Sequence, residues 1–119
     1  MKKDSIGVDI VEFVEIEERL NEKFVSRVLS VAERQLYDKI GNAKRKTSFL
    51  AGRFAAKEAY AKAYKTFSSP LNFRDVSVLN DADGAPYVVS KYRPEDDVMI
   101  SISHSRRYAI AMCIVRNKE

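Results

Sequence analysis

The feature that most constrains the fold is the stretch from Ala43 to about Lys65, which contains no proline and a single glycine, Gly52. It is rich in alanine, the residue with the highest helix propensity. The stretch therefore predicts one long helix in the middle of the chain, beginning after the helix-stopping pair Gly41 and Asn42. We expect the other elements to pack against it.

Before this helix, the pattern of apolar residues predicts one strand and three short helices. The strand covers residues 6–11, where side chains alternate and Asp9 falls on the face opposite the isoleucines. Short helices are expected from Val14 to about Asn21 and around residues 24–29. A third should run from Ser30 to about Ile40, because Ser30 followed by Glu33 forms a capping box.

After the long helix, the apolar period changes from helical to alternating. Residues 75–79 and 86–90 predict a hairpin around a turn at 80–84, and residues 98–103 predict a half-polar strand. Residues 108–115 are apolar on both faces, which predicts a central, buried strand. The expected fold is α+β, with an antiparallel β-meander sheet packed against one long central helix and shorter helices.

Composition limits the class of protein. A chain of 119 residues, 45% hydrophobic and 32% charged, suits one soluble domain over residues 1–119. No run is long enough to span a membrane, and Asp9 and Glu12 interrupt the apolar start that a signal peptide needs. We therefore expect a cytoplasmic protein with no membrane partner.

The charge distribution favours an anionic ligand or an acidic partner. The formal net charge of +4 is too small to require nucleic acid, and we expect no nucleic-acid partner. The first helical region is acidic, whereas a cluster of cations surrounds the long helix. That cluster is either a solvated face or a binding surface. Its members are Lys39, Lys44, Arg45, Lys46, Arg53, Lys57 and Lys62.

Two carboxylates are the candidates for a metal site. Asp9 lies in an apolar strand, where it needs a hydrogen-bond donor, a cation or a metal. Glu58 shares one helical stripe with Phe54 and Lys62, so it is either a metal ligand or half of a surface pair worth about 0.3–0.5 kcal/mol. Paired carboxylates suit Mg²⁺. One histidine, His104, and one cysteine are too few for a convincing zinc site, and His104 is either structural or a phosphate contact.

Three motifs in this order resemble the holo-acyl-carrier-protein synthases, a family of 4'-phosphopantetheinyl transferases. Gly7–Val11 is similar to the N-terminal motif whose aspartate binds Mg²⁺, and Phe49–Ala59 is similar to the signature that carries the second ligand onto Glu58. The third motif, Ser101–Ser105, resembles the last coenzyme-A motif, and a further short segment, Gly84-Ala85-Pro86, resembles a hairpin that borders coenzyme A.

The resemblance implies a reaction and a set of roles. The enzyme would use Mg²⁺ to transfer the 4'-phosphopantetheine arm of coenzyme A to a serine of apo-acyl carrier protein, releasing adenosine 3',5'-bisphosphate, in fatty acid biosynthesis. Asp9 and Glu58 would bind the metal, and Glu58 and Lys62 would act in catalysis. A homotrimer with active sites between subunits is also implied, with Arg45 and Arg53 reaching the neighbour's nucleotide. The expected coenzyme-A contacts are Arg45, Arg53, Lys57, Lys62, Pro86 and His104.

The chain departs from the family pattern at two places. Glu15 stands where relatives carry an arginine that docks the acidic carrier, leaving Arg19, Lys23 and Arg27 as the cations of that region. Lys65–Ser69 replaces a glycine-rich turn.

A competing hypothesis is a noncatalytic module that binds a nucleotide or an acidic protein, but it would leave the pair of carboxylates unexplained. The residues alone do not decide which carrier is modified, whether acyl-coenzyme A is accepted, or whether Glu58 or a metal-bound water takes the serine proton.

Overall fold

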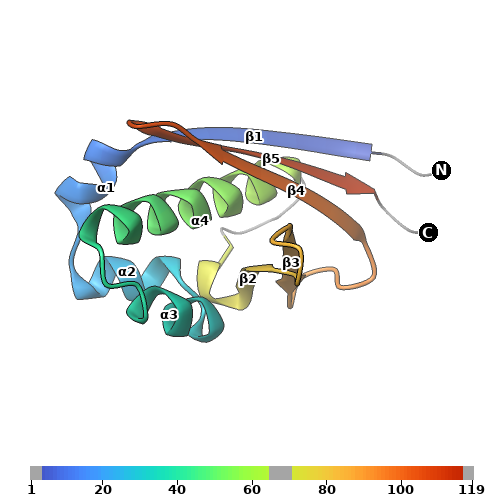
Figure 1. Cartoon of the computed structure of the whole chain (residues 1–119). Coiled ribbons are helices and arrows are strands. Elements are labelled where there is room, and N and C mark those ends of the chain that lie inside the picture. Colours follow the sequence, from blue (N-terminus) through green and yellow to red (C-terminus); the bar gives the residue numbers. More distant parts are fainter. Residues whose placement is uncertain (1–3, 65–70, 117–119) are drawn as a thin grey trace.

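The long helix α4 (Ala43–Ala63) lies between a sheet and a layer of smaller elements (Figure 1). The structure is a computed structural model that describes residues 4–64 and 71–116. On one side of α4, the strands β1 (Asp4–Glu12), β5 (Tyr108–Arg116) and β4 (Asp97–His104) form an antiparallel sheet in that order.

The other side of α4 is covered by the short helices and a hairpin (Figure 1). The helices are α1 (Phe13–Arg19), α2 (Glu22–Val28) and α3 (Val31–Asp38). The short 3₁₀ helix η1 (Phe73–Asp75) leads into a two-stranded sheet of β2 (Val76–Asn80) and β3 (Pro86–Ser90). The predicted α+β class, antiparallel pairing and central helix are confirmed, and the strands divide into two sheets.

The helix starts follow from local hydrogen bonds that the sequence encodes. At α3, the Ser30 hydroxyl accepts from the Glu33 backbone N–H while the Glu33 carboxylate accepts from the Ser30 N–H, so the predicted capping box is confirmed. Asn42 caps α4 by accepting from the Arg45 N–H at 3.1 Å. The predicted end of α4 at Lys65 lies outside the described residues, as does the Lys65–Ser69 turn.

The face of β1 that carries Gly7 and Asp9 is pressed against α4. A Cβ atom on Gly7 would lie 2.0 Å from the carbonyl oxygen of Ala59 and 2.7 Å from the backbone nitrogen of Ala63. The strand and helix backbones can approach this closely only because glycine faces alanine. This contact places Asp9, two residues further along β1, beside the C-terminal half of α4.

The opposite face of the three-stranded sheet is apolar and exposed. β5 is the central strand, as predicted, but only its Ala109, Ala111, Cys113 and Val115 face is buried against the core. The expectation of burial on both faces is therefore wrong for the isolated chain, because α4 covers one side and no described element covers the other. The large apolar side chains more than 40% exposed on this face are Ile6, Val8, Ile10, Met99, Tyr108, Ile110 and Met112.

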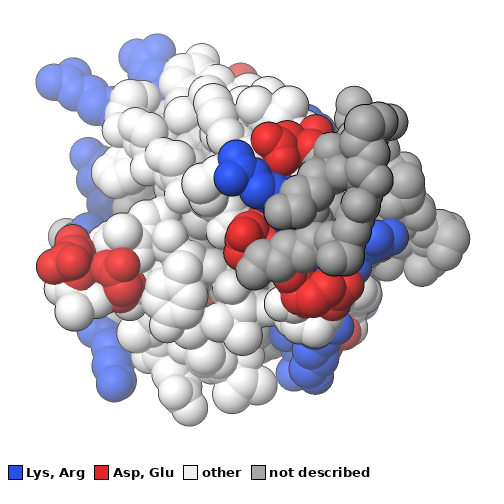
Figure 2. All heavy atoms as spheres, turned by 90° about the vertical axis from the view of Figure 1, so that its right-hand side faces the viewer, with Lys and Arg blue, Asp and Glu red and all other residues white. Residues whose placement is uncertain are grey.

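Charges are mixed on the end of the molecule where the described chain begins and finishes. Figure 2 looks onto this end and shows Asp and Glu side chains interspersed with Lys and Arg side chains, so this view contains no continuous basic face. Within residues 4–64 and 71–116, no helix is long and apolar enough to cross a membrane.

Candidate active site

Asp9, Glu58 and Lys62 meet where β1 crosses the C-terminal half of α4. Lys62 Nζ lies 2.9 Å from Asp9 Oδ1 and donates a further hydrogen bond of 3.1 Å to the carbonyl oxygen of Val8. The Asp9 side chain is only 16% exposed, whereas that of Lys62 is 54% exposed. The structure thus brings together residues from the first and second sequence motifs through the contact at Gly7.

The two carboxylates are close enough to influence each other. Burial raises the pKa of Glu58, the negative charge of Asp9 raises it further, and the charges of Lys62 and Arg19 lower it. A site that holds two repelling carboxylates beside one ammonium group has a place for a cation. The carboxylate oxygens of Asp9 and Glu58 suit a hard ion such as Mg²⁺, which prefers oxygen ligands.

The protein would supply only part of the coordination shell of such an ion. In the described part of the chain, no group of three or more His, Cys, Asp and Glu side chains could hold a metal. Mg²⁺ usually takes one or two carboxylates and completes its shell with water and substrate phosphate. The Asp9 and Glu58 pair is of that kind, and the donor set is wrong for a structural zinc site.

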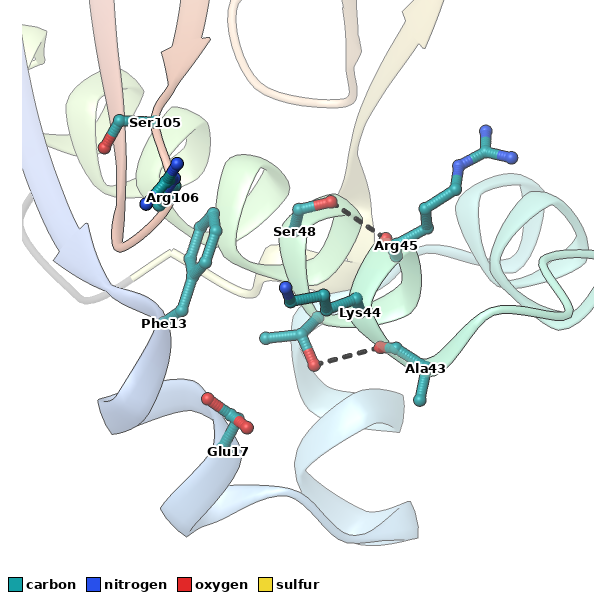
Figure 3. Close-up of a pocket in the computed structure, with 9 residues that line it drawn as sticks. Phe13, Glu17, Ala43, Lys44, Arg45, Ser48, Ser105 and Arg106 are labelled. Atoms are coloured by element: carbon teal, nitrogen blue, oxygen red, sulfur yellow. Dashed lines mark hydrogen bonds between the residues drawn. The ribbon is translucent and has the colours of Figure 1, made fainter.

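A second group of predicted residues surrounds a cavity of about 490 Å³ at the other end of α4. It is lined by Phe13, Glu17, Ala43, Lys44, Arg45, Thr47, Ser48, Ser105 and Arg106. Figure 3 shows Phe13, Ser105 and Arg106 on one side and the first turn of α4 on the other, with the Arg45 guanidinium extending away from Phe13. Three cations and several hydroxyl groups make this cavity suitable for an anionic ligand.

His104 lies next to this cavity rather than next to the carboxylates. Its ring centroid is 6.5 Å from that of Phe13, and the following turn is closed by a hydrogen bond from the Ser105 N–H to the Tyr108 carbonyl. The Phe13 N–H donates to the Arg107 carbonyl at 2.8 Å, which fixes the start of α1 against the same turn. The C-terminal motif and Arg45 therefore belong to one region.

Arg53 and Pro86 lie at the β2–β3 hairpin. Arg53 is 8% exposed, and it donates to the Val78 carbonyl at 3.1 Å and to the Asn80 side chain at 2.6 Å. Asn80 pairs with Pro86 in the hairpin and donates to the Gly84 carbonyl. Arg53 thus holds the turn that carries the Gly84-Ala85-Pro86 motif, and Pro86 itself is half-buried.

Lys57 lies in the interior, where a buried polar network occupies it completely. Its ammonium group donates to the Val28 carbonyl at 2.6 Å, to the Phe73 carbonyl at 2.9 Å and to the Glu33 carboxylate, so all three N–H groups are used. Burial lowers the pKa of Lys57, and the charge of Glu33 opposes that shift. The predicted phosphate contact of Lys57 would require this network to open.

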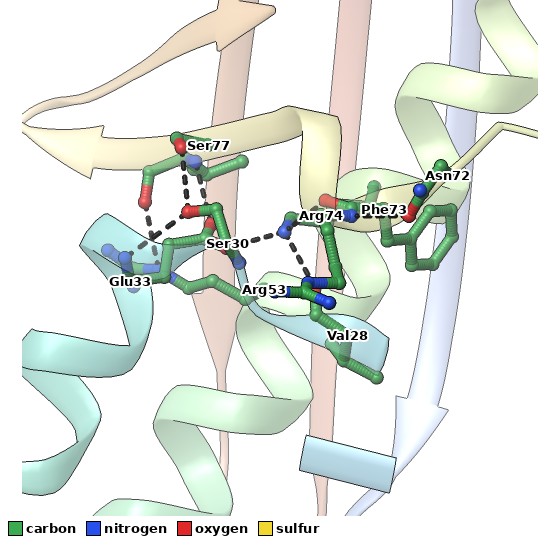
Figure 4. A network of polar contacts seen from close by, with 10 residues as sticks. Val28, Ser30, Glu33, Arg53, Asn72, Phe73, Arg74 and Ser77 are labelled. Atoms are coloured by element: carbon green, nitrogen blue, oxygen red, sulfur yellow. Dashed lines mark hydrogen bonds and ion pairs between the residues drawn. The ribbon is translucent and has the colours of Figure 1, made fainter. Parts of the chain in front are cut away.

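Glu33 is the buried partner of Lys57 that the sequence did not indicate. Besides Lys57, its carboxylate accepts from the N–H groups of Ser30 at 2.8 Å and Val78 at 2.7 Å, and Ser77 joins through the Ser30 hydroxyl (Figure 4). The network ties α3, α4 and β2 together. The capping-box pattern identified Glu33 as a cap, but no local signal relates it to Lys57.

Comparison with known proteins identifies the family. The family profile of the 4'-phosphopantetheinyl transferase superfamily matches residues 5–113. This chain belongs to that superfamily. The resemblance inferred from the three motifs is therefore confirmed.

Relatives in this superfamily match over nearly their whole length. A holo-(acyl-carrier-protein) synthase of a Geobacillus species is 48% identical over 113 residues, covering 92% of this chain and 93% of the relative. The enzyme of the same name from Lactococcus lactis is 45% identical over 112 residues, with 92% and 93% covered.

Solved structures of superfamily members have the same fold. The holo-(acyl-carrier-protein) synthase from Bacillus anthracis, in complex with CoA (3',5'-ADP), is 40% identical, covers 96% of each chain and has a TM-score of 0.86. The Helicobacter pylori synthase in complex with coenzyme A is 33% identical, with a TM-score of 0.77 and with 92% of this chain and 98% of that chain covered.

Proposed function

We propose that this chain is a cytoplasmic holo-acyl-carrier-protein synthase that transfers the 4'-phosphopantetheine arm of coenzyme A to a serine of apo-acyl carrier protein. The observation that carries the proposal is the pair of carboxylates, Asp9 and Glu58, held beside Lys62 in a chain whose relatives bear that enzyme name. Residues 1–119 would act as one domain. The holo-carrier would serve fatty acid biosynthesis.

The reaction exchanges the phosphoanhydride bond of coenzyme A for a phosphate ester bond to the carrier serine. The serine oxygen of the carrier forms a bond to the β-phosphorus of coenzyme A, the bond from that phosphorus to the bridging oxygen breaks, and adenosine 3',5'-bisphosphate leaves. Asp9 and Glu58 would hold Mg²⁺, which when bound would neutralise charge on the pyrophosphate. The serine proton would pass to Glu58 or to a water molecule.

Lys62 is placed to act on the leaving group. Its ammonium group is largely exposed and is held by the Asp9 carboxylate and the Val8 carbonyl. From that position the ammonium group would stabilise the departing bisphosphate electrostatically or protonate it as a general acid. The catalytic residues would therefore be Glu58 and Lys62.

The nucleotide would lie in the basic cavity at the start of α4. Arg45, Lys44 and Arg106 supply charge, and the neighbouring His104 supplies a further hydrogen-bonding group. Arg53 and Pro86 would contribute through the hairpin, which Arg53 holds in place. Lys57 would stabilise the fold, since all its donors are occupied.

We further propose a homotrimer whose active sites lie between subunits. Arg45, which lines the cavity, and Glu58, one of the two carboxylates, lie about 20 Å apart along the axis of α4. The cavity and the carboxylate pair of one chain are too far apart to bind the same phosphate group. The exposed apolar face of the sheet offers an association surface that would bring the cavity of one subunit to the carboxylates of the next. Analytical ultracentrifugation should give a trimer, and a fully active monomer would contradict this arrangement.

The activity is tested by incubating the protein with apo-carrier, coenzyme A and Mg²⁺ and measuring the carrier by mass spectrometry. The carrier should gain one phosphopantetheine group. Glu58→Gln should abolish most of that gain, whereas Asp38→Asn, which neutralises an exposed carboxylate on α3, should leave it unchanged. Binding of coenzyme A without any gain in mass on several apo-carriers would indicate the noncatalytic module instead.

A further inference from the structure

Asn80, the last residue of β2, connects the long helix α4 to the turn of the β2–β3 hairpin. Its side-chain oxygen accepts a hydrogen bond of 2.6 Å from the Arg53 guanidinium group, and its side-chain nitrogen donates one of 2.9 Å to the Gly84 carbonyl. Chemistry fixes the orientation of the amide, because a guanidinium group can only donate and a carbonyl can only accept. Among residues 4–64 and 71–116, no other hydrogen bond joins this turn to α4.

The turn itself, residues 81–85, is ordered by hydrogen bonds of its own. The Asp81 carboxylate accepts from the N–H groups of Asp83 and Ala85, both at 2.9 Å. The Asp81 N–H donates to the Ala85 carbonyl at 2.9 Å, and the Gly84 N–H donates to the Asp81 carbonyl at 3.0 Å. All five residues are exposed, so packing against the core contributes little to their position. Because the shape of the turn is set locally, the connection through Asn80 determines its orientation relative to α4.

The helix end of this connection is held firmly. The guanidinium carbon of Arg53 lies 4.2 Å from the ring centroid of Phe49, and Arg53 Nε donates to the Val78 carbonyl at 3.1 Å. The N–H group of Val78 donates to the Glu33 carboxylate at 2.7 Å, so side chains of α3 and α4 bind both backbone groups of this β2 residue. A buried arginine that is held by a ring and by two acceptors gives Asn80 a fixed point of attachment.

The turn is joined to the side of α4 that carries an arginine of the basic cavity. Arg45, Phe49 and Arg53 follow one another at intervals of one helical turn, so they lie along one stripe of the helix. Arg45 lines the cavity, and its guanidinium group extends away from Phe13 (Figure 3). Arg45 and Arg53 are about 12 Å apart along the helix axis. A nucleotide bound at Arg45 can therefore extend along this stripe to the turn.

We propose that Asn80 is a positioning residue for the donor substrate, coenzyme A. By joining Arg53 to the Gly84 carbonyl, it holds the turn in a fixed orientation beside the nucleotide. A loop that is ordered before binding loses less conformational entropy in the complex, so the connection raises affinity although Asn80 does not touch the ligand. This inference rests on the proposed function, in which the nucleotide lies in the basic cavity. Asn80 belongs to none of the motifs that indicated the site.

Isothermal titration calorimetry and steady-state kinetics of Asn80→Ala test the proposal. Loss of the connection should weaken binding of coenzyme A about fivefold and should raise the KM for coenzyme A by a similar factor. The kcat and the KM for apo-carrier should change less than about twofold. Asn72→Ala is the matched control, because it also removes an exposed asparagine side chain that accepts a hydrogen bond, from the Arg74 N–H at 3.1 Å, but it lies before β2, away from the turn. Its affinity for coenzyme A should equal that of the wild type.

A double variant shows whether Asn80 acts through Arg53. Arg53→Lys keeps the positive charge but loses the planar fork that binds Val78 and Asn80 together. If the two residues form one connection, adding Asn80→Ala to Arg53→Lys should change the affinity for coenzyme A by less than about twofold, because the connection is already broken. Circular dichroism checks that each variant is folded, which is expected because the Asn80 side chain is exposed.

Three results would overturn the proposal. They are an unchanged affinity for coenzyme A in Asn80→Ala, a change confined to kcat or to the carrier KM, and effects of the two substitutions that simply add. Calorimetry needs no turnover, so it separates this inference from the proposed function. A wild type that binds coenzyme A but modifies no carrier would refute the proposed transfer alone, whereas a wild type that does not bind coenzyme A would refute both.

Discussion

Removing one partner of the Glu33–Lys57 pair should destabilise the protein far more than the loss of a surface ion pair. Both side chains are fully buried. In Glu33→Gln, the amide nitrogen must point toward Lys57 or toward the Val78 N–H, and both are donors. The Lys57 ammonium would also lose its counter-charge, so the expected cost is about 3–5 kcal/mol of unfolding free energy. Lys57→Met should cost a similar amount, because it leaves the Glu33 carboxylate buried without a cation.

The double variant Glu33→Gln with Lys57→Met measures the coupling. It removes both charges of the pair together, so its cost should be clearly smaller than the sum of the two single changes. Urea unfolding followed by far-ultraviolet circular dichroism, at one protein concentration for all variants, gives the free energies. Asp38→Asn is the control, since its exposed pair with Arg34 should contribute less than about 1 kcal/mol. Single variants that cost less than about 1 kcal/mol, or costs that simply add, would refute the assignment of a closed structural network.

Three further outcomes are expected. Gly7→Ala should cost more than about 2 kcal/mol in urea unfolding, because a Cβ there lies 2.0 Å from the Ala59 oxygen, whereas Gly84→Ala, at φ 86° in open space, should cost about 1–2 kcal/mol. Because the pKa of Glu58 is raised, the folded state binds more protons than the unfolded state at pH values between the ordinary and the raised pKa. The free energy of unfolding of the wild type should therefore fall as pH rises through that interval. In metal-free buffer, Glu58→Gln should remove this fall. Mg²⁺ should raise the thermal midpoint of the wild type but not that of Asp9→Asn, and equal shifts would argue against the metal site.

The sequence predicted those parts of the fold that depend on short-range signals. The alanine-rich run without proline identified α4, and Ser30 with Glu33 identified the start of α3. Alternation in β1 placed Asp9 on the face opposite the isoleucines, and that face packs on α4 through Gly7. Each of these features is determined within a few residues of the chain.

Features that depend on distant partners could not be predicted. The apolar pattern of β5 has the same appearance for a strand buried in the core and for a strand with one face open for association, and periodicity does not distinguish them. Lys57 belongs to a basic cluster in the sequence, but its partner Glu33 lies on another helix. The guanidinium group of Arg19 stacks on the rings of Phe24 and Phe54, which come from two further helices. Spacing along one element carries no information about such contacts.

The central claim is that phosphopantetheine transfer occurs at a site shared between subunits, with the carboxylate pair from one chain and the basic cavity from another. Subunit mixing tests it most directly. Glu58→Gln and Arg45→Ala should each be nearly inactive alone, because one lacks an intact carboxylate pair and the other an intact cavity. Refolded together from denaturant, they should form hybrid trimers with some complete sites, and the mass spectrum of the carrier should show renewed addition of phosphopantetheine. The result that would contradict the claim is a mixture that stays as inactive as its parents while wild type refolded in the same way is active. The carboxylate pair and the basic cavity of one site would then not come from different subunits.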